Sequence, residues 1–305
     1  MFKYSNLQEG QVVDLKNEIA LVSPVDTPLV TLLYQRGRVV PAYDITVTWM
    51  EKALAEGSVR TNEEGMEAGK YANSTLELKE NICQILETGT KVSGTVQALN
   101  PKGIEDVYVS EINDRMAELK MEQERCFLNG KKDTSATRKM AGLMSMALQK
   151  EVDGVLTEDH IIDAMELMFN AGCHGDVYLF CGAKVKRMIN NFVKQENSAL
   201  YQIQAGQNAY GFQVQVIATD FGNVNIVIDR HMKGDEILIV DIDQVEIAEL
   251  RPAFYEALPK NGDYFHGHII SENTIKLLNH NSAVALTGIA DAQSAVTLDS
   301  KKSKK

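Results

Sequence analysis

Long hydrophobic runs are absent from this sequence of 305 residues. A transmembrane helix needs roughly 20 predominantly apolar residues, and no stretch approaches that length. The segment from Met1 to Val13 also lacks the basic region, continuous apolar region and small-residue cleavage site of a secretory signal. These absences argue against a membrane-spanning or secreted protein, and we expect a protein of a cytoplasm-like compartment with no membrane partner.

Cysteine is scarce, with four residues that are scattered along the chain: Cys83, Cys126, Cys173 and Cys181. They form no C-x-x-C pair, and each lies in an apolar stretch. A disulfide framework or a zinc knuckle would need paired or regularly spaced cysteines. We therefore expect reduced and mostly buried thiols.

Positive charge is in deficit, because 31 Lys and Arg face 42 Asp and Glu, for a net charge of -11. Nucleic-acid affinity depends on Lys and Arg that displace counterions, so the charge argues against a dedicated DNA-binding protein. The exception is the basic stretch Lys301 to Lys305. It is typical of a solvated end, and weak, non-specific contact with nucleic acid is the alternative.

Recognisable catalytic motifs are missing as well. The sequence has neither G-x-G-x-x-G nor G-x-S-x-G, and Gly130-Lys131-Lys132 lacks the upstream glycine and strand of a phosphate loop. Cys173 and His174 are adjacent after a predicted helix end, where side chains rarely form a nucleophile and base pair. Nothing here indicates a catalyst.

Two sets of residues could bind a metal ion, but each has a structural explanation. His266 and His268 lie on one face of a predicted strand without a visible third ligand. Asp229, Asp241 and Asp243 lie at strand ends, where acids commonly cap turns but could also bind magnesium. We assign no catalytic, cofactor-binding or metal-binding residue, and we expect no cofactor.

The overall composition, 44% hydrophobic and 24% charged, is that of a folded globular protein. At this length we expect two or three subregions, and the hydrophobic patterns predict an α+β fold. The first subregion, residues 1–38, carries apolar residues that need a partner surface. Pro24 and Pro28 prevent a helix from running through it, so we predict a partly extended arm.

Strict alternation follows the arm and predicts a long β-hairpin. Tyr43, Ile45, Val47 and Trp49 share one face, and alternation resumes at Leu76 after the Gly-, Ala- and Glu-rich residues 51–73. An isolated two-stranded ribbon is marginally stable, so it should lie against a neighbouring subunit. Folding back over its own domain is the alternative.

A long helix is predicted from Gly103 to Asn129, closed by Gly130 and about 40 Å long. One face of this helix, which we name the spine helix, carries an apolar stripe that includes Ile112, Met116 and Leu119. We expect that stripe to lie under strands that follow Leu250.

An α+β region is predicted over residues 152–193. It contains a helix capped by Thr157 and ended by Gly172, a strand Val177–Cys181 and a helix Ala183–Gln195. The remainder is strand-rich, and the small, polar residues 291–305 are expected to be disordered. The predicted strands are 212–218, 224–229, 236–242, 245–250, 264–271 and 274–278.

This order of elements, with several short stretches, resembles the major capsid proteins of tailed bacteriophages with the shell fold first seen in phage Hong Kong 97. The likeness is nearest to the branch typified by the major head protein of a podovirus-like phage. Each stretch is a weak motif, and their order from about residue 10 to about residue 290 is the specific part. The stretches are Asp14-Leu15, Ser23 to Leu29, Val92 to Thr95, Glu118 to Lys120, Glu124-Arg125, Ala141 to Leu143, Asp220 to Gly222 and Leu250 to Pro252.

The resemblance implies a structural subunit of an icosahedral head that encloses double-stranded DNA and has no active site. It implies an N-terminal arm at 1–38, an extended loop (E-loop) at 39–95 and a peripheral (P) domain with the spine helix at 96–150. It further implies an axial (A) domain at 151–240, returning P-domain strands at 241–290 and a flexible basic tail at 291–305. Some members cross-link Lys to Asn between subunits, and no such pair is assigned here.

The implied partners are further copies of the chain in pentameric and hexameric capsomers, with portal, scaffolding and cement proteins. Scaffolding is expected to be a separate protein, and assembly is expected in the host cytoplasm. Two alternatives remain open at this point. One is an encapsulin-like nanocompartment shell of the same fold, and the other is a cytoplasmic α+β enzyme that uses Asp229, Asp241 and Asp243.

Overall fold

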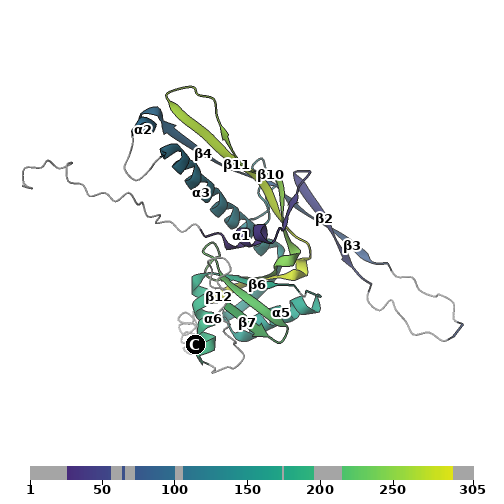
Figure 1. Cartoon of the computed structure of the whole chain (residues 1–305). Helices are drawn as coiled ribbons and strands as arrows, with labels where there is room; N and C mark the ends of the chain where they lie inside the picture. The colour runs from purple at the N-terminus through teal and green to yellow at the C-terminus, as the bar shows by residue number, and fades with distance from the viewer. Residues whose placement is uncertain are drawn as a thin grey trace, which may run out of the picture.

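The computed structural model describes residues 26–55, 64–65, 73–99, 106–173, 175–195 and 215–290. Two sheets form the body, and a separate two-stranded hairpin projects from it (Figure 1). This mixed architecture agrees with the predicted α+β class. Within the described part of the chain, no helix is both long and apolar enough to cross a membrane.

The smaller sheet has four strands in the order β1-β10-β11-β4. Their bounds are β1 Val39–Pro41, β10 Val245–Ala257, β11 Tyr264–Leu277 and β4 Gln84–Ser93. β1 runs parallel to β10, and the other pairs are antiparallel. The spine helix α3, Val107–Asn129, lies along this sheet (Figure 1).

The spine helix begins where Asp106 caps it, because the Asp106 carboxylate accepts hydrogen bonds from the backbone N–H of Tyr108 and Val109. The predicted start at Gly103 lies outside the described residues. At 23 residues the helix is about 35 Å long. It packs through Leu119 against Leu86 and Ile269, with Ile112 and Met116 beside them, which confirms the predicted stripe.

Gly130 ends the spine helix as predicted, but it does not adopt the left-handed conformation that is common for glycine at a helix end. Its φ is -55°, which any residue adopts. A Cβ at Gly130 would lie 2.5 Å from the Cys126 carbonyl oxygen and 2.7 Å from that of Met140. The glycine therefore permits two backbone segments to approach closely.

The predicted hairpin is present as β2, Thr46–Ala53, paired antiparallel with β3, Thr75–Ile82. The first strand starts later than the alternation suggested, since Tyr43 lies before it and is 91% exposed. Most of the predicted tip, residues 56–63 and 66–72, lies outside the described part of the chain.

The larger sheet has six strands in the order β5-β12-β9-β6-β8-β7. Helices α5, Glu158–Asn170, and α6, Ala183–Gln195, pack with it, and its core includes Leu179, Ile239 and Met165. Thr157 and Gly172 bound α5 as predicted, with Gly172 at a φ of +80°. The strand bounds are β5 Leu148–Val155, β12 Ala283–Ala290, β9 Ile237–Asp241, β6 Val177–Cys181, β8 Gly222–Ile228 and β7 Gln215–Thr219.

Residues 28–35 correct the prediction of an extended arm, because they form the helix α1, Pro28–Gln35. Pro28 lies at the first helical position, where its missing N–H is not needed and its fixed φ favours the helix. Proline was interpreted as a helix breaker when it is here a helix start. The rest of the predicted arm, residues 1–25, lies outside the described residues.

The predicted strands also differ from the structure in two ways: two predicted strands form one, and two observed strands were not predicted. The two strands predicted at 264–271 and 274–278 form one strand, β11, since its pairing with β10 continues across Glu272 and Asn273 with register shifts in β10. Strands β5 and β12 were not predicted. β12 lies in the larger sheet, so the range 241–290 contributes strands to both sheets. The described residues also contain the short helices α2 Gly94–Ala98, α4 Leu143–Met146, η2 Ile242–Gln244 and η3 His280–Ser282.

Candidate assembly surface

One face of the β2–β3 hairpin is apolar and exposed. Met50 pairs across the strands with Leu78, and Lys52 pairs with Leu76. Met50 is 69% exposed, and Leu76 and Leu78 are each 61% exposed. Leu54 follows the end of β2 and is also exposed. We name Met50, Leu76 and Leu78 the hairpin face, and the described part of this chain leaves it uncovered.

The root of the hairpin is fixed to the body by one buried amide, that of Asn81. Its Nδ2 donates to the carbonyl oxygens of Ala141 at 2.9 Å and Ile275 at 2.8 Å. Its Oδ1 accepts from the backbone N–H of Ala141 and of Ile82, both at 2.9 Å. Asn81 is fully buried, so these bonds form away from water and set the direction in which the hairpin leaves the body.

A second contact between the hairpin and the body lies on the hairpin face opposite to Met50. The Glu51 carboxylate accepts from the backbone N–H of His280 at 3.0 Å and lies 2.7 Å from His280 Nδ1. Lys79 Nζ is 4.0 Å from the same carboxylate. One hairpin face is therefore tied to the body by Glu51, whereas the Met50 face contacts the body at its root, where Lys132 Nζ pairs with Glu80 at 2.7 Å, and is exposed beyond it.

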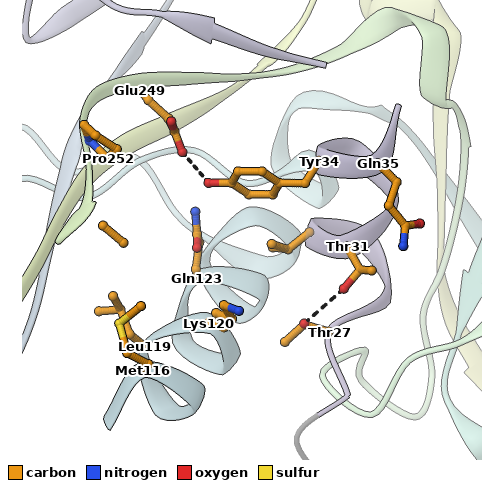
Figure 2. A pocket seen from close by; sticks show the side chains of 12 residues that line it. Thr27, Thr31, Tyr34, Gln35, Met116, Leu119, Lys120, Gln123, Glu249 and Pro252 are labelled. Carbon is orange, nitrogen blue, oxygen red and sulfur yellow. Dashed lines mark hydrogen bonds between the residues drawn. The ribbon is translucent and has the colours of Figure 1, made fainter. Parts of the chain in front are cut away.

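A groove of about 430 Å³ lies between α1, the spine helix and β10 (Figure 2). Val30, Met116, Leu119, Pro252 and Ala253 give it an apolar lining. Its polar groups include Tyr34 and Glu249, joined by a hydrogen bond in which the Tyr34 hydroxyl donates. Burial and the neighbouring Glu249 raise the pKa of Tyr34.

Gln123 is a buried polar residue in the lining of this groove. Its side chain extends from the spine helix toward the groove (Figure 2), and the residue is only 5% exposed. Its Nε2 has no hydrogen-bond partner among the described residues. A buried amide nitrogen normally has an acceptor. The Gln123 side chain also acts on the Tyr34 hydroxyl, whose pKa it lowers against the larger effects of burial and Glu249, so that hydroxyl is an acceptor within its reach.

Helix α1, which forms one wall of the groove, is held by a buried carboxylate of the spine helix. Glu124 accepts hydrogen bonds from the backbone N–H of Leu29 and of Val30, each at 2.7 Å. Burial and the neighbouring Asp229 raise the pKa of Glu124 well above its ordinary value, against the two N–H groups that lower it. At the other end of α1, Arg36 Nη2 pairs with Asp176 at 2.6 Å.

The predicted histidine pair lies in β11 as expected. His268 Nδ1 is 3.5 Å from Glu87 on β4, and its Nε2 is 3.6 Å from Glu256 on β10. His266 instead packs its ring on Tyr264, with centroids 5.0 Å apart. No three His, Cys, Asp or Glu side chains of the described ranges are placed to hold a metal ion.

The aspartates at strand ends have the capping role that the sequence offered as their structural explanation. Asp241 accepts from the backbone N–H of Asp243 at 3.0 Å and of Gly175 at 3.2 Å, and burial raises its pKa. Asp229 accepts from the N–H of His231 at 2.7 Å. The structure brings Asp229 to Glu124 rather than to Asp241 or Asp243.

The cysteines are free thiols, with Cys83 and Cys181 buried and Cys126 and Cys173 partly buried, as predicted. Burial raises the pKa of Cys83 and of Cys126 to about 11, so both thiols are unreactive. His174 and the basic tail 291–305 lie outside the described residues.

Sequence reasoning missed the residues that hold the candidate surface in place: Asn81, Glu51 and Glu124. For two of these residues, their position in the sequence indicated a buried role. Asn81 is a polar residue directly before the apolar run that starts at Ile82, and Glu124 stands beside Gln123 on the buried side of the spine helix. A polar residue on an apolar stripe indicates a buried hydrogen-bonding role, but its partner lies far away in sequence.

Comparison with known proteins gives one family and one fold. A family model described as SU10 major capsid protein matches residues 3–290. The capsid protein of cyanophage A-1(L) has a TM-score of 0.68 at 11% identity, over 95% of this chain and 99% of that chain. The capsid protein of Myoviridae phage XM1 has a TM-score of 0.65 at 14% identity, over 93% and 99%.

A nanocompartment shell is also similar in fold. The SrpI encapsulin of Synechococcus elongatus PCC 7942 has a TM-score of 0.58 at 9% identity, over 89% of this chain and 92% of that chain. Among curated protein sequences, none matches. The structural likenesses confirm the predicted phage-capsid fold, and the family match covers nearly the whole chain.

Proposed function

Because this chain belongs to the SU10 major capsid protein family and is a structural subunit of a phage head, we propose that its hairpin face makes the contact that joins neighbouring subunits. Capsid proteins assemble into capsomers, and this chain is a structural protein rather than an enzyme. The proposal concerns which surface of the subunit does the joining.

The observation that carries the proposal is the hairpin face itself. Three large apolar side chains lie on a two-stranded ribbon whose opposite face is already tied to the body by Glu51. A contiguous apolar patch on a projecting element is unfavourable in water and is typical of an interaction site. Burying it against another copy would make subunit stability and assembly parts of one equilibrium.

We propose in addition that the capsomers are pentamers and hexamers of an icosahedral head that encloses double-stranded DNA. The net charge of -11 supports this role, because an acidic shell does not adhere to packaged DNA. Portal, scaffolding and cement proteins are the further partners, and assembly takes place in the host cytoplasm. The family match favours this role over a cargo-enclosing nanocompartment.

For the domains we propose the arm at 1–38, the E-loop at 39–95 and the P domain at 96–150. The A domain at 151–240 and the returning strands at 241–290 follow, with the basic tail at 291–305. The projecting hairpin β2–β3 supports the part of the E-loop range between residues 46 and 82, whereas β1 and β4 of that range lie in the smaller sheet. The spine helix supports the P-domain range. The membership of β12 in the larger sheet favours adding residues 283–290 to the A domain.

The test is a double variant, Met50→Asp and Leu78→Asp, which places two charges on the hairpin face. Both side chains are exposed in the subunit, so circular dichroism should show a folded chain with unfolding changed by no more than about 1 kcal/mol. Electron microscopy and sedimentation should show loss of capsomers and shells. Val109→Asp, at another exposed apolar position with 50% exposure, is the matched control. Normal shells from the double variant would refute the role of the hairpin face.

A further inference from the structure

The turn between β10 and β11 carries an Asn-Gly pair, Asn261–Gly262. Both residues are exposed, and the turn lies at the end of the smaller sheet that is remote from the larger sheet (Figure 1). In an Asn-Gly pair the glycine has no Cβ, so its backbone nitrogen can approach the side-chain amide carbon of the asparagine with little hindrance. The chain has a second such pair, Asn129–Gly130. The two pairs differ in what surrounds their reacting atoms.

The backbone N–H of Gly262 is available for reaction, whereas that of Gly130 is not. Gly262 N makes no hydrogen bond to another residue of the described ranges. Gly130 N donates to the Cys126 carbonyl oxygen at 2.9 Å, where the spine helix ends. Asn129 is held as well, because its Nδ2 donates to the His231 carbonyl oxygen at 2.9 Å. An N–H that is bonded inside the fold must open locally before it can lose its proton.

A hydroxyl group is placed on the side-chain amide of Asn261. The Tyr264 hydroxyl donates to Asn261 Oδ1, the oxygen on which negative charge develops when a nucleophile adds to Cγ. The Tyr264 ring lies against Gly262, since a Cβ on that glycine would be 2.6 Å from the ring atom Cε1. Lys91 Nζ, 3.7 Å from the ring centroid, helps to fix the ring. Asn129 has the reverse arrangement, because its Oδ1 is buried and finds no donor in the described part of the chain.

We propose that Asn261 is a self-modification site, at which Gly262 supplies the nucleophile and Tyr264 stabilises the oxyanion. The Gly262 nitrogen gives its proton to water and forms a bond to Asn261 Cγ, and the oxyanion forms on Oδ1 beside the Tyr264 hydroxyl. The Cγ–Nδ2 bond then breaks, and the amide nitrogen takes a proton from water and leaves as ammonia. Water opens the resulting succinimide ring at one of its two carbonyls, which gives aspartate or isoaspartate at position 261.

The reaction changes an exposed turn of the subunit without an enzyme. Each modified subunit gains a negative charge two residues before Asp263, and isoaspartate also adds a methylene group to the backbone. The Asp263 carbonyl oxygen accepts from the N–H of Gly94 at 3.1 Å, so the change is made where the turn meets the start of α2. The hairpin face lies on a different sheet, and the modification therefore acts independently of it.

The test follows the full chain by peptide mass mapping during incubation at mildly alkaline pH, with the mass gain from amide to acid as the readout. In the folded chain, Asn261 should react at least about tenfold faster than Asn129, because the bonded N–H of Gly130 must first open. In guanidinium chloride the fold no longer distinguishes the two pairs, and their rates should agree within about threefold. Equal rates in the folded chain, or no reaction at Asn261, would overturn the site.

A variant tests the role of the hydroxyl. Tyr264→Phe keeps the ring, and the rate at Asn261 should fall about threefold to tenfold in the folded chain, as expected for the loss of one exposed hydrogen bond. The same variant should leave the rate in denaturant unchanged. Tyr178→Phe removes a tyrosine hydroxyl in the larger sheet and is the matched control, with no change expected at Asn261. A hydroxyl that merely anchored the turn would slow the reaction, so an unchanged or increased rate in folded Tyr264→Phe would overturn the role of Tyr264.

Discussion

The hydrogen bonds of Asn81 give the sharpest prediction for the junction between the hairpin and the body. Replacement of Asn81 by Leu keeps the side-chain volume similar but removes the partners of two buried N–H groups, those of Ile82 and Ala141. Each buried donor left unsatisfied costs about 1–3 kcal/mol. The carbonyls of Ala141 and Ile275 also lose a donor, although each keeps a second lone pair. The expected loss is about 4 kcal/mol.

That loss is a large part of the roughly 5–15 kcal/mol that stabilises a typical domain. It is measured as the change in the free energy of unfolding by urea, followed by circular dichroism on the dissociated subunit. Asn113→Leu, at an exposed position of the spine helix, is the matched control and should change stability by no more than about 0.5 kcal/mol. If Asn81→Leu cost less than about 1 kcal/mol, the Asn81 amide would not hold the hairpin root, and the direction of the hairpin would need another cause.

Two other predictions test the spine helix. Met116→Asp places an unpaired charge at a partly buried position against the smaller sheet and should cost about 1–3 kcal/mol, whereas Glu118→Gln on the exposed side should cost no more than about 0.5 kcal/mol; equal soluble yields of the two would show that the stripe is not buried. Gly130→Ala forces a Cβ to 2.5 Å from the Cys126 carbonyl and should lower the thermal midpoint markedly, while Gly234→Ala, whose nearest atom would be 3.6 Å away, should not. A normal midpoint for Gly130→Ala would mean that the two backbones can separate at little cost.

Periodicity alone was enough to locate the elements that bury one face. The spine helix and the helix Ala183–Gln195 follow from apolar residues at helical spacing, and the hairpin follows from alternation at Val47 and Trp49. The glycines and caps at Thr157 and Gly172 fixed the bounds of α5, since those residues act locally. Helix caps can be predicted from sequence because the capping residue and the backbone groups that it satisfies lie within a few residues of each other.

The errors came from residues whose role depends on distant partners. Pro28 was interpreted as a helix breaker, yet residues 28–35 form α1 because Glu124 of the spine helix caps the N-terminus of α1. β12 lies between β5 and β9 in the larger sheet and was not predicted. Its apolar residues show little alternation, as expected for a strand that is buried on both faces. The candidate surface itself was anticipated as an unsupported ribbon, but the residues that orient it, Asn81 and Glu51, were not.

The place of β12 in the larger sheet has a consequence for how the subunit is made. Residues 148–155 form β5, whose strand partner is β12, residues 283–290. During synthesis, β5 therefore waits unpaired for more than a hundred residues until the last strand of the sheet leaves the ribosome and inserts between it and β9. Such long-range pairing makes folding slow and leaves a strand edge open meanwhile. The hairpin, in contrast, closes locally and early, so a nascent chain displays its hairpin face before its own larger sheet is complete.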